Sequence, residues 1–173
     1  MQFKNIVYLI ILCAAFEVLA KDASAIHIGD LISEPVTNTG EVVYITQHLI
    51  DGTLFAIDIN KKEIIAKVPV GLRPSKPVLD GATIYVITQD KKISIIDTKT
   101  FKITAEMRLP HNGDAGATLS KKFHKLYVPH NVHGKISVID TISQSVVKTI
   151  DAKCRVFGQL VLSSDETKLL VMN

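Results

Sequence analysis

The sequence repeats one pattern three times, at a spacing of about forty residues. Each copy has an apolar run with adjacent Tyr and Val, a polar turn, an apolar run that ends in Ile-Asp, and a third apolar run. Successive tyrosines are 41 and 42 residues apart, and successive aspartates are 39 and 43 residues apart. The marker pairs are Tyr44 and Asp58, Tyr85 and Asp97, and Tyr127 and Asp140. A period near forty that is built only from short strands is typical of β-propeller blades.

Each copy predicts four antiparallel strands, which we call A to D in chain order. Ile, Val, Tyr, Phe and Thr dominate the runs, which suits half-buried pleated surfaces. Asp51-Gly52 and Asp80-Gly81 supply turn chemistry between runs. The predicted strands are 30–36, 41–46, 54–59 and 64–70; then 76–79, 83–88, 93–97 and 102–109; then 115–120, 125–129, 135–140 and 145–150; and finally 158–162 and 168–172.

These strands predict an all-β chain: a β-propeller of four-stranded antiparallel blades with about three and a half blades. The propeller is expected over 28–173, with repeats at 28–71, 72–111, 112–152 and 153–173. Closed propellers have about four to eight blades, and open blade edges invite pairing with other chains. The half copy at the end favours the interpretation that this sequence is a piece of a longer propeller. One alternative is that two copies of the chain associate through their open blade edges and close the ring together. The other is that the chain is a decayed remnant of a complete propeller.

The first residues have the pattern of a signal peptide. Lys4 provides a short positive region, and 6–16 is an uncharged apolar run of eleven residues. That length suits a signal peptide better than a membrane span. Cleavage is expected after Ala20, or after Ala25, with delivery to the periplasm or the cell exterior and no membrane contact afterwards. An uncleaved anchor is the alternative.

Charge and cysteine content narrow the partners. The 20 basic residues are scattered along the chain among 17 acidic ones. Nucleic-acid binding needs a continuous basic stripe, so we do not expect nucleic acid as a partner.

Cysteine content limits disulfide bonds. After removal of Cys13, Cys154 is the one remaining thiol, so an intrachain disulfide is excluded from the mature chain. Cys154 is interpreted as a small buried residue, with an intermolecular bridge and a reactive thiol as alternatives.

The repeated aspartate has a structural interpretation. Asp58, Asp97 and Asp140 each end strand C and precede a tight turn. A carboxylate at such a position accepts backbone N–H groups of the following residues. No copy differs from the other two in a way that would indicate catalysis.

The third copy carries a family resemblance. Segments 126–131, 135–141 and 146–150 resemble the YVTN-type β-propeller repeat, as do 84–86 with 93–98, and 68–71 with Pro74. The resemblance covers about 41–173, and 170–173 is a remnant of the tetrapeptide that names the family. It implies an exported bacterial or archaeal repeat protein. Distant relatives with this fold bind d1-type haem or form dehydrogenase heavy chains, which is an analogy of fold alone.

Strand direction sorts the loops between two faces. D–A and B–C loops share one face, where propeller ligands usually bind. We expect this ligand-binding face to carry nine polar or reactive residues: His48, Arg73, His111, Asn112, His130, Asn131, His133, Cys154 and Arg155.

Three histidines on this face are candidate metal ligands. His111 precedes strand A of the third copy and His130 follows strand B, so antiparallel pairing brings them together, with His133 as a third ligand. Imidazoles suit zinc, copper and haem iron; the other interpretation is polar loop histidines. Arg73 and Arg155 are candidates for an anionic ligand.

Catalytic motifs are missing from the sequence. It has no nucleophile elbow, Gly-rich phosphate loop, paired-carboxylate site or His-Glu-x-x-His motif. The sequence therefore predicts a module that binds a protein or small-molecule ligand through the loop face, more in keeping with a non-enzyme, without a cofactor. The alternative is a truncated cofactor-bearing propeller enzyme, of a redox type with haem or copper or of a lactonase-like type.

Overall fold

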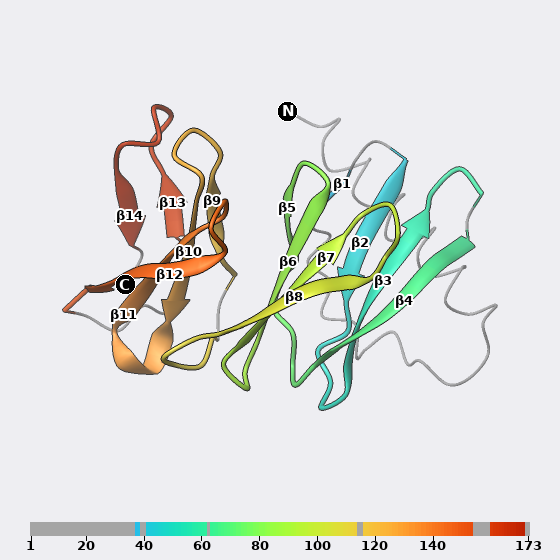
Figure 1. The fold of residues 1–173 in the computed structure, drawn as a ribbon, viewed down its shortest axis with the longest axis horizontal. Helices are drawn as coiled ribbons and strands as arrows, with labels where there is room; N and C mark the ends of the chain where they lie inside the picture. Colours follow the sequence, from blue (N-terminus) through green and yellow to red (C-terminus); the bar gives the residue numbers. More distant parts are fainter. Residues whose placement is uncertain (1–36, 39–40, 62, 114–115, 154–159, 172–173) are drawn as a thin grey trace, which may run out of the picture.

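The structure, a computed structural model, describes residues 37–38, 41–61, 63–113, 116–153 and 160–171. This part of the chain folds into fourteen strands in four antiparallel sheets. Three sheets have four strands and the last has two, each in simple chain order. The sheets follow one another as a fan from right to left in Figure 1. The all-β fold of three and a half propeller blades is confirmed.

The strand bounds follow the repeat. The first blade has β1 (Thr37–Asn38), β2 (Val42–Thr46), β3 (Gly52–Asp58) and β4 (Glu63–Gly71). The second has β5 (Val78–Asp80), β6 (Thr83–Thr88), β7 (Lys92–Asp97) and β8 (Ile103–Arg108). The third has β9 (Thr118–Ser120), β10 (Lys125–His130), β11 (Lys135–Asp140) and β12 (Ser145–Asp151), and the fourth has β13 (Leu160–Leu162) and β14 (Leu169–Val171).

The A strands are shorter than expected. The second one was expected from Lys76, but β5 begins at Val78. Pro77 precedes it, and a proline has no N–H to donate to a strand ladder. The first A strand was expected over 30–36, outside the described residues, and the structure places β1 directly after that range.

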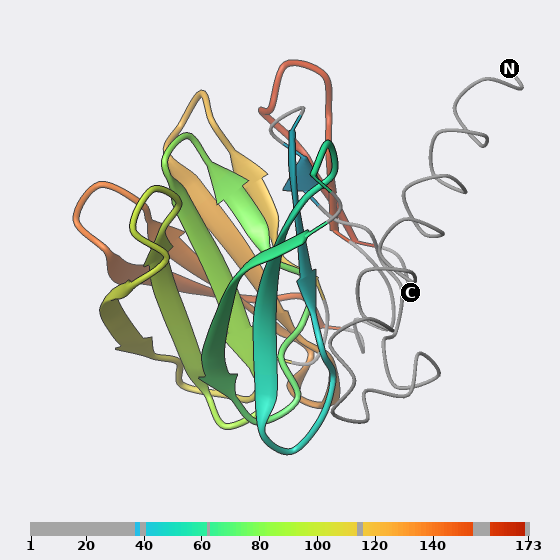
Figure 2. The same ribbon diagram turned by 90° about the vertical axis from the view of Figure 1, so that its right-hand side faces the viewer.

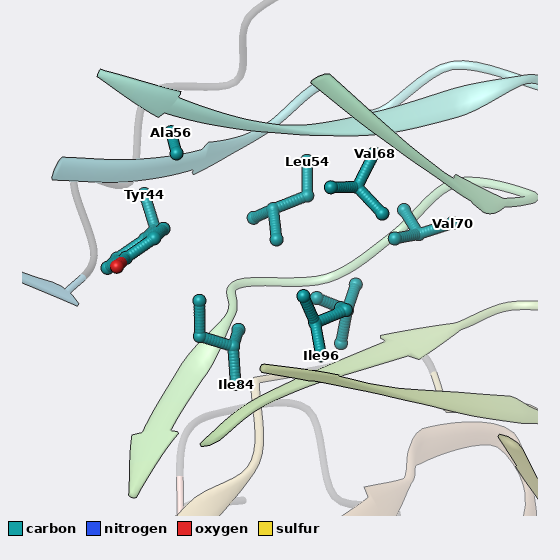
Figure 3. Packing of buried hydrophobic residues seen from close by; sticks show 8 residues of the cluster. Tyr44, Leu54, Ala56, Val68, Val70, Ile84 and Ile96 are labelled. Atoms are coloured by element: carbon teal, nitrogen blue, oxygen red, sulfur yellow. The ribbon is translucent and has the colours of Figure 1, made fainter. Parts of the chain in front are cut away.

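Apolar side chains from facing blades form the core. Residues of β2, β3 and β4 meet Ile84 and Ile96 of the second blade, as Figure 3 shows. Tyr85 and Ile95 then face Leu126 and Ile139 of the third blade. The alternation of each strand sends one set of side chains to the preceding blade and the other to the next. Figure 2 shows the blades one behind another in this stack.

The A strands are the inner strands and the D strands the outer ones. Thr118 of β9 donates its hydroxyl to the Leu160 carbonyl of β13 at 2.5 Å, so consecutive A strands lie side by side. By contrast, six of the seven residues of β12 are exposed. This arrangement puts the solvated surface on the D strands and leaves the loops at the two ends of the sheets for recognition.

The repeated aspartates close the C–D turns. The carboxylate of Asp58 accepts the backbone N–H groups of Asn60 and Lys61, both at 3.0 Å. Asp97 does the same two and three residues on, at 3.2 and 2.7 Å, and so does Asp140, at 3.0 and 2.8 Å. These bonds are the Asx-type turn expected from the pattern.

A further bond links two recurring residues of the repeat, a tyrosine and a threonine, across a blade boundary. The hydroxyl of Tyr85 in β6 hydrogen-bonds the side chain of Thr141, which follows Asp140 in the third blade. Burial raises the pKa of the Tyr85 phenol, and the bond to Thr141 opposes that rise. Tyr85 of the second blade and Thr141 of the third are therefore linked across the blade boundary.

Within the described residues, we find no helix with the length and apolar character needed to cross a membrane. The leader expected over 1–20 or 1–25 lies outside those residues.

Candidate binding face on the B–C and D–A loops

Five loops gather at the lower end of the blades in Figure 1. Of the loops that the structure describes, three are B–C loops, at 47–51, 89–91 and 131–134, and two are D–A loops, at 72–77 and at 109–113 with 116–117. The third B–C loop contains a 3-10 turn, η2 (Asn131–His133), which Gly134 ends with a left-handed φ of 58°. We call these loops together the loop face.

His130 is a buried structural residue of this face. Its side chain is 0% exposed, and it lies on the same side of β10 as Leu126 and Val128, facing the second blade. Its Nδ1 lies 2.8 Å from the Asn112 carbonyl oxygen and its Nε2 lies 2.7 Å from Ser137 Oγ. Because a carbonyl can only accept, Nδ1 of the neutral ring carries the proton, and Nε2 accepts from the Ser137 hydroxyl.

These two bonds give His130 a positioning function. They fasten the D–A loop at Asn112 to strands β10 and β11 of the third blade. Both ring nitrogens of His130 are engaged, so no lone pair is left to bind a metal ion. This arrangement weighs against His130 as the ligand that the sequence suggested.

The structure does bring the three histidines together. The ring centroids of His111 and His133 are 4.3 Å apart, with the planes tilted by 31°. His111 and His130 meet edge to face at 5.4 Å. His133 is exposed and His111 is half-buried, so these two rings form an accessible pair above the buried His130.

Cations surround the exposed pair. The pKa of His111 is lowered, first by burial and then by the positive charges of His133, Lys135 and Lys91. Lys135 stands directly opposite His130 in the β10–β11 ladder. The Lys91 carbonyl accepts the N–H of Leu109, two residues before His111. Backbone pairing therefore places the main chain of Lys135 opposite His130 and that of Lys91 next to Leu109.

The other expected residues have varied environments. Arg73 is exposed, with a left-handed φ of 42°. His48 lies apart from the three histidines, with its Nδ1 3.2 Å from the Pro74 carbonyl oxygen. Asn112 is exposed and contributes its carbonyl, whereas Asn131 keeps a buried Oδ1 that has no hydrogen-bond partner among the described residues. Cys154 and Arg155 lie outside the described residues.

Among the residues that the structure describes, no group of three or more His, Cys, Asp or Glu side chains is arranged to hold a metal ion. The metal hypothesis thus stays a prediction whose remaining donors are His111 and His133.

The loop face also exposes apolar side chains that the sequence analysis did not single out. Ile50 is 69% exposed in the first B–C loop, and Val132 is 72% exposed in the third. Ser137, Lys91 and Lys135 were missed too. The period-2 alternation could have found Ser137, because it stands directly opposite Val128, two residues from His130 along β10.

No family model matches the chain, and no curated protein matches it in sequence. Many solved structures resemble it, 676 chains in all. One is hydrazine synthase of Kuenenia stuttgartiensis, with a TM-score of 0.69 and 19% sequence identity. The match covers 85% of this chain and 44% of that one, so this chain spans less than half of its length. At this identity the likeness concerns the fold alone.

Proposed function

We propose that this chain is an exported propeller module that binds a protein or small-molecule ligand through its loop face. The observation that carries the proposal is the contrast between strands and loops. Equivalent strand positions recur as core residues in successive blades, such as Ile84 and Leu126. The loops between them diverge, and recognition usually resides in such loops.

The side chains on this face support binding. Exposed Ile50 and Val132 offer apolar contact, and the His111–His133 pair with its lysines offers charge. Isolated exposed apolar residues are common on any surface, so it is the place of Val132 beside His133 in η2 that favours recognition.

The proposal can be tested by photo-crosslinking in the producing cell. A photoreactive phenylalanine analogue replaces Val132 or Ile50 in separate variants. Ile142 is the matched control, because it is 74% exposed but lies in a C–D turn at the opposite end of the third blade. We expect discrete adducts from Val132 and Ile50 and few from Ile142.

Equal or stronger crosslinking from Ile142 would contradict the loop face as the binding surface. For small ligands, the matching test is a thermal-shift screen of exported-compartment metabolites, followed by His133→Gln. If a compound raises the melting temperature of the unchanged chain, His133→Gln and Val132→Ala to the same extent, it binds outside the loop face.

Export and repeat type belong to the same proposal. The positive, apolar and small-residue pattern of 1–25 supports export to the periplasm or beyond. The Asp turns and the Tyr85–Thr141 bond support a YVTN-type repeat, because they give the recurring residues structural roles: the aspartates close the C–D turns, and Tyr85 bonds to the next blade. N-terminal sequencing of the mature product should begin at Lys21 or Ile26; a soluble product that retains Met1 would contradict export.

A further inference from the structure

We propose that the His111–His133 pair, with Lys91 and Lys135, forms a binding site for an oxyanion, a carboxylate or a phosphate-type group of the ligand. The inference deepens the proposed function, on which it rests, by naming the chemistry that the loop face recognises. The site lies where the D–A loop between the second and third blades meets the B–C loops of both.

Two backbone pairings and one side-chain bond bring the segments of this site together. The Leu109 N–H to Lys91 carbonyl bond of 2.7 Å brings the B–C loop of the second blade to the start of the D–A loop. The His130 bond to the Asn112 carbonyl fixes the other side of His111. Strand pairing of His130 with Lys135 sets the lysine at the foot of β11. The residues of the site thus lie on segments that these contacts join.

The electrostatics favour an anion over a metal cation. The positive charges of Lys135 and Lys91 both act on His111. Such a field repels a divalent cation and attracts an oxyanion, for which lysine ammonium and imidazolium groups are charge-assisted donors. Only two imidazoles remain free to bind a metal, because both nitrogens of His130 are occupied.

Among the described residues, three carboxylates near the cluster are engaged by other groups. Asp151 is opposite Lys135 in the β11–β12 ladder, but its Oδ1 accepts the N–H of Lys153. Asp90 hydrogen-bonds the Thr88 hydroxyl, close to Gly71 and Lys92 on the side of the first blade. Glu106 pairs with Lys92 at 2.9 Å. Each of these three carboxylates thus has a hydrogen-bond or ion-pair partner outside the cluster.

Sulfate is the probe of choice, because it remains a dianion between pH 5 and 8. The full chain is titrated with sodium sulfate at constant ionic strength, kept with sodium chloride, and the imidazole proton signals are followed by NMR. We expect saturable shifts of the His111 and His133 signals.

The variants define the site. Lys135→Gln and His133→Gln should each weaken sulfate binding about twofold to fivefold, the range for a surface charge contact. The controls are Lys99→Gln and His124→Asn, a lysine and a histidine in turns at the opposite end; Asn suits the left-handed φ of 51° at position 124. Both controls should bind as the unchanged chain does.

A parallel titration with sodium acetate distinguishes a carboxylate ligand from a phosphate-type ligand. Tighter sulfate binding indicates a phosphate-type ligand, and tighter acetate binding indicates a carboxylate; either supports the site. No saturable shift with either anion, or equal loss in the control variants, would overturn it, as would zinc binding through His111 and His133 without anion binding. If Val132 still formed crosslinks in that case, the loop face would remain the proposed binding surface, but the anion site would be rejected.

Discussion

At the scale of the residue, the carboxylates that close the C–D turns carry the clearest electrostatic signature. Hydrogen bonds to Thr100 lower the pKa of Asp97, and a backbone bond to Lys61 lowers the pKa of Asp58. The pKa of Asp140 is lowered furthest, first by Lys125, whose Nζ lies 2.5 Å from its Oδ2, and then by Ser143. The folded chain therefore prefers these groups ionised.

Replacing Asp140 by Asn should destabilise the protein in a pH-dependent way. A pKa lowered on folding contributes stability above the unfolded value, about 3.9, and this contribution is lost as the pH falls toward the folded value. The difference in unfolding free energy between Asp140→Asn and the unchanged chain should be full at pH 7 and shrink from pH 4 to pH 2. Urea unfolding at several pH values measures it.

Asp51→Asn is the control for this series. Asp51 is exposed in a B–C loop. Its replacement should leave the urea midpoint nearly unchanged at every pH. A loss for Asp140→Asn that stays constant down to pH 2 would show that the carboxylate charge has no part in the turn.

At the scale of the element, the D–A loop packs so closely on the hairpin of β2 and β3 that position 52 has no room for a side chain. A Cβ placed on Gly52 at the start of β3 would lie 2.1 Å from Pro74 Cδ and 2.7 Å from the Gly71 carbonyl oxygen. A proline ring and a backbone oxygen cannot turn aside as a flexible side chain does. The glycine is therefore needed for its lack of a side chain.

Gly52→Ala should cost about 1–3 kcal/mol of unfolding free energy, the usual range for overpacking. The matched control is Gly116→Ala, where the nearest atom to a new Cβ is Lys76 Cβ at 3.9 Å. Chemical denaturation of both variants measures the contrast. A loss in Gly52→Ala no larger than in Gly116→Ala would mean that the loop relaxes freely around position 52.

The elements were predictable where an apolar run is long enough. β6 (Thr83–Thr88) and β11 (Lys135–Asp140) have the expected bounds, because in each a run of consecutive buried, mostly β-branched residues begins and ends with polar ones. The A strands have only two or three residues, too few to show a period. His130 looked like a loop residue because Pro129 and Asn131 flank it; its burial depends on packing against the second blade, which sequence alone does not reveal.

At the scale of the whole molecule, each blade packs on its sequence neighbours. One core cluster joins the first and second blades, another joins the second and third, and a third joins the third to β13 and β14. At the last boundary, Glu166 accepts the Ser120 hydroxyl at 2.6 Å and the Lys122 N–H at 3.0 Å. Stability is thus distributed over boundaries, as in other repeat proteins.

Substitutions at different boundaries should therefore add. Ile84→Val in the first cluster and Ile139→Val in the second should each cost about 0.5–1.5 kcal/mol, and the double variant should match their total within about 0.5 kcal/mol. Tyr85→Phe and Thr141→Ala are the contrasting pair, since they share one bond and should not add. Denaturation of the two double-mutant cycles measures both; strong coupling between Ile84 and Ile139 would contradict independent boundaries.

The equivalence of the boundaries has a consequence for how such a gene can change. Leu126, Val128 and Ile139 occupy in the third blade the places that Ile84, Val86 and Ile96 occupy in the second. An in-frame deletion of one period would set the first blade against the third and recreate an apolar boundary of the same kind. Recombination between repeats can therefore lengthen or shorten this gene by whole blades without first evolving a new interface.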